Sequence, residues 1–211
     1  THLSKNSKIS TLRRRLVSIS MVHRLKGHYL DTKHPIIVEN LMGIRRVKGS
    51  IQKGKKPILI NHLKSIINVI NEQKTEEIKK LRDKSIILIG FGGGFRRTEL
   101  ISIDHEDLEF VPEGLKITIK RSKTDQFGEG MTKGLPYFDN EIYCPVTNLK
   151  KWLEISKIKS GPIFRRFSKG LSLTDKRLTD QSVVLLMKEY LNLAGIENKN
   201  FAGHSLRSGF A

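Results

Sequence analysis

The spacing of apolar residues predicts a chain built mainly of helices. They recur every three or four positions, the spacing of a buried helical face. This pattern is found in residues 11–26, 61–72, 146–157 and 180–194, the last of which is closed by Gly195. It is also found in a stretch that begins at Pro35 and in a stretch that is capped by Thr75. The expected inward residues are Leu12, Leu16, Ile19, Met21, Ile37, Leu41, Ile44, Leu63, Ile66, Ile67, Ile70, Ile78, Leu81, Ile87, Leu88 and Phe91.

Residues 108–137 follow a different pattern. Three short stretches, Glu109–Val111, Leu115–Arg121 and Met131–Tyr137, are rich in β-forming residues. Pro112-Glu113-Gly114 provides a turn between the first two, and the polar loop 122–130 separates the second from the third. The expected fold class is therefore mainly α with one small antiparallel β-sheet. The run Ile86–Ile89 would also suit a buried strand, but its spacing from Ile78 and Leu81 favours a helix.

A basic linker interrupts the helical pattern after the second predicted helix. Residues 48–57 contain two glycines, a proline and four lysines, with no apolar periodicity. We therefore expect two domains, residues 1–56 and residues 57–211.

Charge gives the first indication of a partner. The chain has 39 Lys and Arg against 21 Asp and Glu, a net charge of +18. Residues 1–56 have 14 of the basic residues and two of the acidic ones, a net +12. This excess predicts a surface that neutralises phosphates, although the solvated surface of a lysine-rich protein would look similar. The candidate DNA contacts are Arg13, Arg14, Arg15, Arg45, Arg46, Lys48, Lys53, Lys55 and Lys56.

Composition also argues against several classes of protein. The lone Cys144 provides neither a disulfide framework nor a cysteine-based zinc site. No run of about 18 apolar residues is present, and the N-terminus lacks the apolar segment of a secretion signal. We expect an intracellular, cytoplasmic protein that associates with DNA.

Two motifs carry candidate chemistry. The first is Gly93-Gly94-Phe95-Arg96-Arg97-Thr98-Glu99-Leu100. Its glycines would suit a phosphate loop, but neither a Gly-Lys-Ser/Thr sequence nor a G-x-G-x-x-G pattern accompanies them, and glycines near a helix end often serve packing. The second is His204-Ser205-Leu206-Arg207, followed by Ser-Gly-Phe-Ala. Taken separately, Arg96 with Glu99 would also describe a helical ion pair, and His204 with Arg207 a polar helix start.

Together the two motifs resemble the tyrosine recombinase (phage integrase) family. The first is similar to that family's Gly-Leu-Arg-x-Ser-Glu-Leu block, and the second to its His-x-x-Arg block at a similar separation. Lys123, in Arg121-Ser122-Lys123-Thr124, matches the lysine that the family places in a loop of its small sheet; most loop lysines are simply solvated. The resemblance extends to residues 10–16, 41–46 and 81–84 and so covers nearly the whole chain. It implies a partial helical core-binding domain followed by an incomplete catalytic domain.

The resemblance also implies a mechanism. The family breaks and rejoins double-stranded DNA without a metal or another cofactor, through a 3′-phosphotyrosine. Arg96 and Arg207 would bind the non-bridging phosphate oxygens, and Glu99 would hold Arg96 or His204. His204 would bond the phosphate or assist proton transfer, and Lys123 would protonate the leaving oxygen.

One element of the family pattern is not found. The family's nucleophilic tyrosine follows the His-x-x-Arg block, whereas Tyr29, Tyr137, Tyr143 and Tyr190 all precede His204. We therefore assign no nucleophile and expect a recombinase cut off before it, and shortened at its N-terminus. The alternative is a remnant that binds DNA without cutting it. The family assembles as homotetramers on DNA, partly through its C-terminal segment, so assembly by this chain is doubtful.

Overall fold

The computed structural model describes residues 5–49, 54–120 and 130–210. Lys53 and Lys123, two candidate residues, lie outside these ranges. The chain divides into two compact units, Thr1–Gly54 and Lys55–Ala211.

The first unit pairs α2 (Ile9–Leu25) with α3 (Pro35–Lys48). Pro35 occupies the first turn of α3, as predicted, and the His34 ring caps that helix by accepting the Ile36 N–H. The inward faces are only half-buried, and the predicted burial of Ile19 and Met21 is wrong, because they are 48% and 65% exposed. Within the described part of this unit, α2 packs on a single helix, which covers one stripe of its surface and leaves the rest open.

Six α-helices are described in the second unit. They are α4 (Ile60–Glu72), α5 (Glu77–Gly92), α6 (Arg97–Ser102), α7 (Pro145–Ser156), α8 (Asp180–Leu193) and α9 (Ser205–Phe210), with 3₁₀ turns η1 (His105–Asp107) and η2 (Asn198–Asn200). All four residues predicted to face inward from α4 are buried. The run Ile86–Ile89 is helical, within α5. The N-cap of α5 is Glu76 rather than the predicted Thr75, while Gly195 closes α8 with the expected left-handed φ of 70°.

The predicted sheet is present as β1 (Leu108–Val111), β2 (Gly114–Ile119) and β3 (Met131–Pro136), antiparallel and in that order. A second, two-stranded antiparallel sheet, β4 (Arg165–Phe167) with β5 (Leu173–Arg177), was not predicted. The sequence Leu-Thr-Asp-Lys-Arg of β5 does not alternate between apolar and polar residues, so the usual strand signal is missing. The class is nevertheless confirmed as mainly α with small antiparallel sheets.

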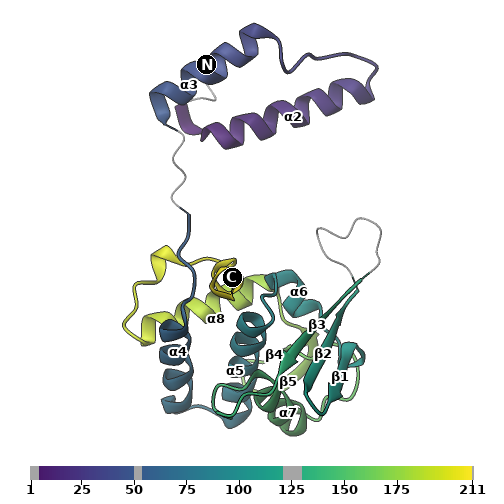
Figure 1. Ribbon diagram of the computed structural model, residues 1–211, viewed down its shortest axis with the longest axis vertical. Helices are drawn as coiled ribbons and strands as arrows, with labels where there is room; N and C mark the ends of the chain where they lie inside the picture. The colour runs from purple at the N-terminus through teal and green to yellow at the C-terminus, as the bar shows by residue number, and fades with distance from the viewer. Residues whose placement is uncertain (1–4, 50–53, 121–129, 211) are drawn as a thin grey trace. The chain divides into compact units, whose positions relative to one another are not determined.

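Helix α5 is the centre of the second unit, packing against α4, α7, α8 and α9. In Figure 1 the three-stranded sheet lies on one side of α5 and α4 on the other. Trp152 of α7 is completely buried, and its indole N–H donates to the Ile163 carbonyl. No helix within the described ranges is long and apolar enough to cross a membrane.

A buried carboxylate, Asp83, ties α5 to α8. It accepts hydrogen bonds from Arg82 (2.7 and 2.8 Å), from the Lys79 ammonium (2.9 Å) and from the Tyr190 hydroxyl (2.7 Å). The Arg82 guanidinium also stacks on the Phe167 ring of β4, 4.5 Å from its centroid. Burial, together with the charge of Asp83, raises the pKa of Tyr190 well above its usual value. Tyr190 is therefore a core residue.

Candidate active site

The glycine-rich segment forms a tight turn between α5 and α6. Gly94 has a φ of 54°, in the left-handed region, and the Phe95 N–H donates to the Gly90 carbonyl at 3.2 Å. A Cβ on Gly93 would lie 2.1 Å from the Phe95 ring, and one on Gly94 would lie 2.8 Å from the Phe210 ring. Close packing and turn geometry thus account for these glycines, as the packing interpretation anticipated.

Arg96 follows this turn at the N-cap of α6 and is paired with Glu99. One carboxylate oxygen of Glu99 accepts the Arg96 backbone N–H at 2.9 Å, and the other accepts the Arg96 guanidinium at 2.5 Å. The Glu99 side chain is only 2% exposed, whereas that of Arg96 is 22% exposed. A buried carboxylate therefore fixes both the backbone and the side chain of Arg96, while the guanidinium still reaches solvent.

Arg207 is brought to the same carboxylate from the far end of the unit. Its guanidinium lies 3.7 Å from Glu99 and is 42% exposed. Helix α9, which carries it, is held by the first residues of the unit: the Ile58 N–H donates to the Ser205 carbonyl at 2.8 Å. A Cβ on Gly209 would lie 1.7 Å from the Ile58 carbonyl oxygen. Only glycine permits this approach, and it sets the position of Arg207.

The two arginines thus converge on one glutamate, whereas the motifs had predicted that Glu99 holds Arg96 or His204. His204 lies directly before α9, one helical turn from Arg207, with an exposed side chain. Lys123 lies in the part of the chain that the structure does not describe. Its assignment therefore stays a prediction.

Lys133 is a residue at this site that the sequence reasoning missed. Its ammonium donates to the carbonyls of Gly93 (2.6 Å) and Gly94 (3.2 Å) and lies 4.5 Å from the centroid of the Phe95 ring. Burial lowers the pKa of Lys133, the nearby Arg207 and Arg96 charges lower it further, and Glu99 opposes them. The inward direction of Lys133 could have been inferred from the alternation of β3, because Lys133 shares a face with the buried Leu135.

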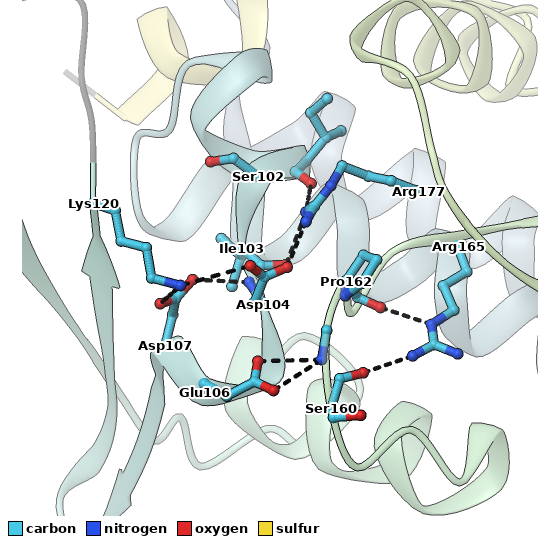
Figure 2. Close-up of polar contacts among 12 residues, drawn as sticks. Ser102, Ile103, Asp104, Glu106, Asp107, Lys120, Ser160, Pro162, Arg165 and Arg177 are labelled. Carbon is cyan, nitrogen blue, oxygen red and sulfur yellow. Dashed lines mark hydrogen bonds and ion pairs between the residues drawn. The ribbon is translucent and has the colours of Figure 1, made fainter.

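A polar network fixes the other end of α6. Arg177 of β5 donates to the Ile101 carbonyl at 2.6 Å and pairs with Asp104, which also lies 3.6 Å from the Lys120 ammonium (Figure 2). Lys120, close to the end of β2, also pairs with Asp107 at 2.8 Å, and this bond raises the pKa of Lys120. Helix α6 is therefore tied at its start by Glu99 and at its end by Arg177.

Apart from Lys53, which lies outside the described residues, the predicted DNA contacts are exposed, and they are found in both units. Arg13, Arg14 and Arg15 lie on α2, and Arg45 and Arg46 lie in the last turn of α3. Three of the candidate lysines are also exposed, namely Lys48, Lys55 and Lys56. The Lys48 ammonium donates to the Lys5 and Ser7 carbonyls, and that of Lys55 donates to the Lys199 carbonyl. Lys55 and Lys56 belong to the second unit.

Comparison with known proteins shows to which family the chain belongs. The model of the Phage integrase family matches residues 58–211, which include Arg96, Glu99, His204 and Arg207. The chain belongs to the phage integrase family. Within that family it is 42% identical, over 99% of its length, to an integrase/recombinase XerD homolog of Selenomonas ruminantium. It is 30% identical over 68% of its length to the tyrosine recombinase XerD of Staphylococcus haemolyticus. The chain spans 61% and 45% of these relatives, respectively.

Solved structures of family members share the fold. The XerH recombinase in a post-cleavage complex with its difH substrate has a TM-score of 0.59 at 17% identity, covering 98% of this chain and 61% of that one. A lambda integrase dimer bound to a core site has a TM-score of 0.51 at 14% identity, covering 97% of this chain and 56% of that one. At such identities the likeness establishes the fold alone.

Proposed function

We propose that this chain is the phosphate-binding part of a site-specific recombinase that breaks and rejoins DNA through a 3′-phosphotyrosine. The observation that carries the proposal is the convergence of Arg96 and Arg207 on the buried Glu99. Two guanidinium groups that reach solvent and pair with one buried carboxylate form a preorganised site for a tetrahedral anion. Their separation by 110 intervening residues makes a merely local ion pair a poor explanation.

The chemistry follows from how charge develops in the reaction. When a tyrosine oxygen attacks the scissile phosphate, the pentacoordinate transition state holds more negative charge on its non-bridging oxygens than the diester does. Arg96 and Arg207 would each donate to those oxygens, and Glu99 would keep both guanidinium groups in place. Losing one such donor costs a rate factor of about 10²–10³.

Proton transfers complete the proposed mechanism. Lys123 would protonate the leaving 5′-oxygen, and His204, exposed beside Arg207, would bond a phosphate oxygen or assist the proton transfer. The nucleophile is not assigned to a tyrosine of this chain. Tyr190 in particular is buried, and its hydroxyl donates to Asp83.

Double-stranded DNA is the proposed partner, and the first unit would be part of a core-binding domain. Two structural relatives support this: XerH was solved on a difH substrate, and a lambda integrase tetramer was solved on a Holliday junction. The exposed arginines of α2 and α3 would contact the phosphate backbone. A tetramer on DNA belongs to the proposal for the whole protein.

Binding is tested by fluorescence anisotropy with a labelled duplex over a series of salt concentrations. The logarithm of affinity should fall linearly with the logarithm of salt concentration. Replacing Arg45 and Arg46 with glutamine should reduce that slope by about one for each phosphate that is no longer neutralised. A matched control is Lys151→Gln, an exposed lysine of α7 already paired with Glu141 at 3.1 Å. An affinity independent of salt would refute the electrostatic account.

Cleavage is tested with a suicide DNA substrate, which traps a covalent protein–DNA adduct. An adduct formed by the natural protein that contains this chain supports the recombinase, and its absence supports the remnant that only binds. In a protein that forms the adduct, Arg96→Ala or Arg207→Ala should abolish cleavage while most DNA binding remains. Full cleavage by either variant would remove that arginine from the mechanism.

A further inference from the structure

Lys133 differs from the other lysines of its sheet in what it bonds. Lys116 on β2 pairs with Glu109 at 3.0 Å, and Lys120 pairs with Asp107 at 2.8 Å. Within the described ranges, Lys133 is in no ion pair, and its ammonium bonds instead to the two carbonyls of the Gly93–Gly94 turn. A half-buried ammonium bonded to neutral carbonyls keeps its full positive charge for the surroundings.

Those surroundings are the proposed phosphate site. Arg96, Glu99 and Arg207 are the charged groups that act on Lys133, and they come from the start of α6 and from α9. The turn that Lys133 holds ends at Gly94, two residues before Arg96, so a shift of that turn would move the N-cap of α6 and the Arg96 guanidinium with it.

The net charge of the described groups shows what the positive charge of Lys133 contributes to the site. Arg96, Arg207 and Glu99 together carry a net +1, and Lys133 raises this to +2. A phosphodiester carries one negative charge, and the pentacoordinate transition state of the proposed reaction carries two. The field of a cluster with charge +2 therefore favours the transition state over the ground state.

We propose that Lys133 is a positioning residue of the phosphate site, which holds the Gly93–Gly94 turn in place for Arg96 and supplies the charge that offsets Glu99. The inference rests on the proposed function, since it assumes that the two arginines receive a tetrahedral anion. Among the described residues, it adds one of β3 to a site otherwise built from α6, α9 and the residues directly before them.

The test uses inorganic sulfate, a tetrahedral dianion whose charge is constant across the pH range needed. The ¹⁵N-labelled chain is titrated with sulfate at constant ionic strength, following the side-chain Nε–H signals of Arg96 and Arg207. Lys133→Met should weaken sulfate binding about tenfold, whereas the matched control Lys116→Met, which removes an exposed lysine already paired with Glu109, should leave it unchanged.

A pH profile separates a charge effect from a packing effect. Because the pKa of Lys133 is lowered, wild-type affinity should begin to fall at a lower pH than titration of exposed lysines would produce. Lys133→Arg keeps its charge throughout and should bind with an affinity that stays flat between about pH 8 and 10. The profiles are compared in chains that all carry Lys123→Met, so that the lysine proposed as the proton donor does not contribute to them.

The outcomes are distinct. Equal sulfate affinity in wild type and Lys133→Met, or a wild-type pH profile in Lys133→Arg, would overturn the role of Lys133 and leave the two-arginine site standing. A wild-type chain whose Arg96 and Arg207 signals do not respond to sulfate would overturn the phosphate site itself, and this inference with it. Weakened sulfate binding in Lys133→Met, together with an affinity of Lys133→Arg that stays flat with pH, would support the proposal most directly.

Discussion

Replacing Asp83 with alanine should destabilise the second unit severely. The carboxylate is completely buried and accepts four hydrogen bonds, two of them from Arg82. Its removal leaves the Arg82 guanidinium, 8% exposed, without its counter-charge and the Tyr190 hydroxyl without its acceptor. Lys79 is 25% exposed and can turn towards water, so its share of the loss is small.

The magnitude follows from the cost of an uncompensated buried charge. Breaking a buried ion pair by removing one partner lowers the free energy of unfolding by about 3–5 kcal/mol. A domain has about 5–15 kcal/mol of net stability, so a large part of it would be lost. For a unit of this size each kcal/mol shifts Tm by about 2–4 °C, which gives a drop of roughly 6–20 °C.

Urea unfolding followed by tryptophan fluorescence is a suitable assay, because Trp152 is the only tryptophan of the chain and is buried in this unit. Asp175→Ala is the matched control: Asp175 also pairs with an arginine, Arg165, but is 97% exposed, so its loss should cost about 0–1 kcal/mol. If Asp83→Ala proved as mild as this control, the buried-charge reasoning would be refuted. Adding Arg82→Met to Asp83→Ala should recover part of the loss.

Three further predictions concern the same unit. Gly209→Ala places a Cβ against the Ile58 carbonyl and should lower the free energy of unfolding, measured in urea, by at least about 1–3 kcal/mol. The amide signals of α9 should also shift, and unchanged signals would contradict the packing. The raised pKa of Tyr190 keeps its proton in the folded state, so the free energy of unfolding of the wild type should fall as pH rises above about 10, where the unfolded tyrosine ionises. The free energy of unfolding of Tyr190→Phe should fall less steeply with pH. Parallel curves for the two proteins would exclude the effect. Arg177→Met removes the guanidinium that donates to the Ile101 carbonyl at the end of α6, and it should cost about 1–3 kcal/mol with faster amide exchange in α6. Unaltered exchange would count against this anchor.

Local pattern was enough to predict most helices and the three-stranded sheet. In α4 the period of Leu63, Ile66 and Ile70 is long and regular, and the helix buries all three residues. The same reasoning failed for Ile19 and Met21, because amphipathic spacing states which residues could be buried and not whether a partner covers them. The hairpin of β4 and β5 was missed because its short, largely polar strands lack the alternation that marks a buried face.

The residues of the candidate site were likewise only partly predictable from the sequence. Arg96 and Arg207 were identified from short motifs, and the structure adds that they meet on Glu99. The contributions of Lys133 and Arg177 depend on backbone carbonyls far away in sequence, at Gly93 and Ile101. Every residue has a backbone carbonyl, so no sequence motif predicts a contact with one. The alternation of β3 around Lys133 was the one sequence feature that indicated its position.

The bond between the Ile58 N–H and the Ser205 carbonyl has a consequence for when the site assembles during synthesis. The two residues are 147 positions apart, so this contact closes a loop that contains almost the whole second unit, and such nonlocal contacts form slowly. A nascent chain can build α4 and α5 early, but it cannot dock α9 until Gly209 has left the ribosome. Arg207 therefore reaches Glu99 only after residues 58–209 have been made, and shorter nascent chains carry Arg96 without its counterpart.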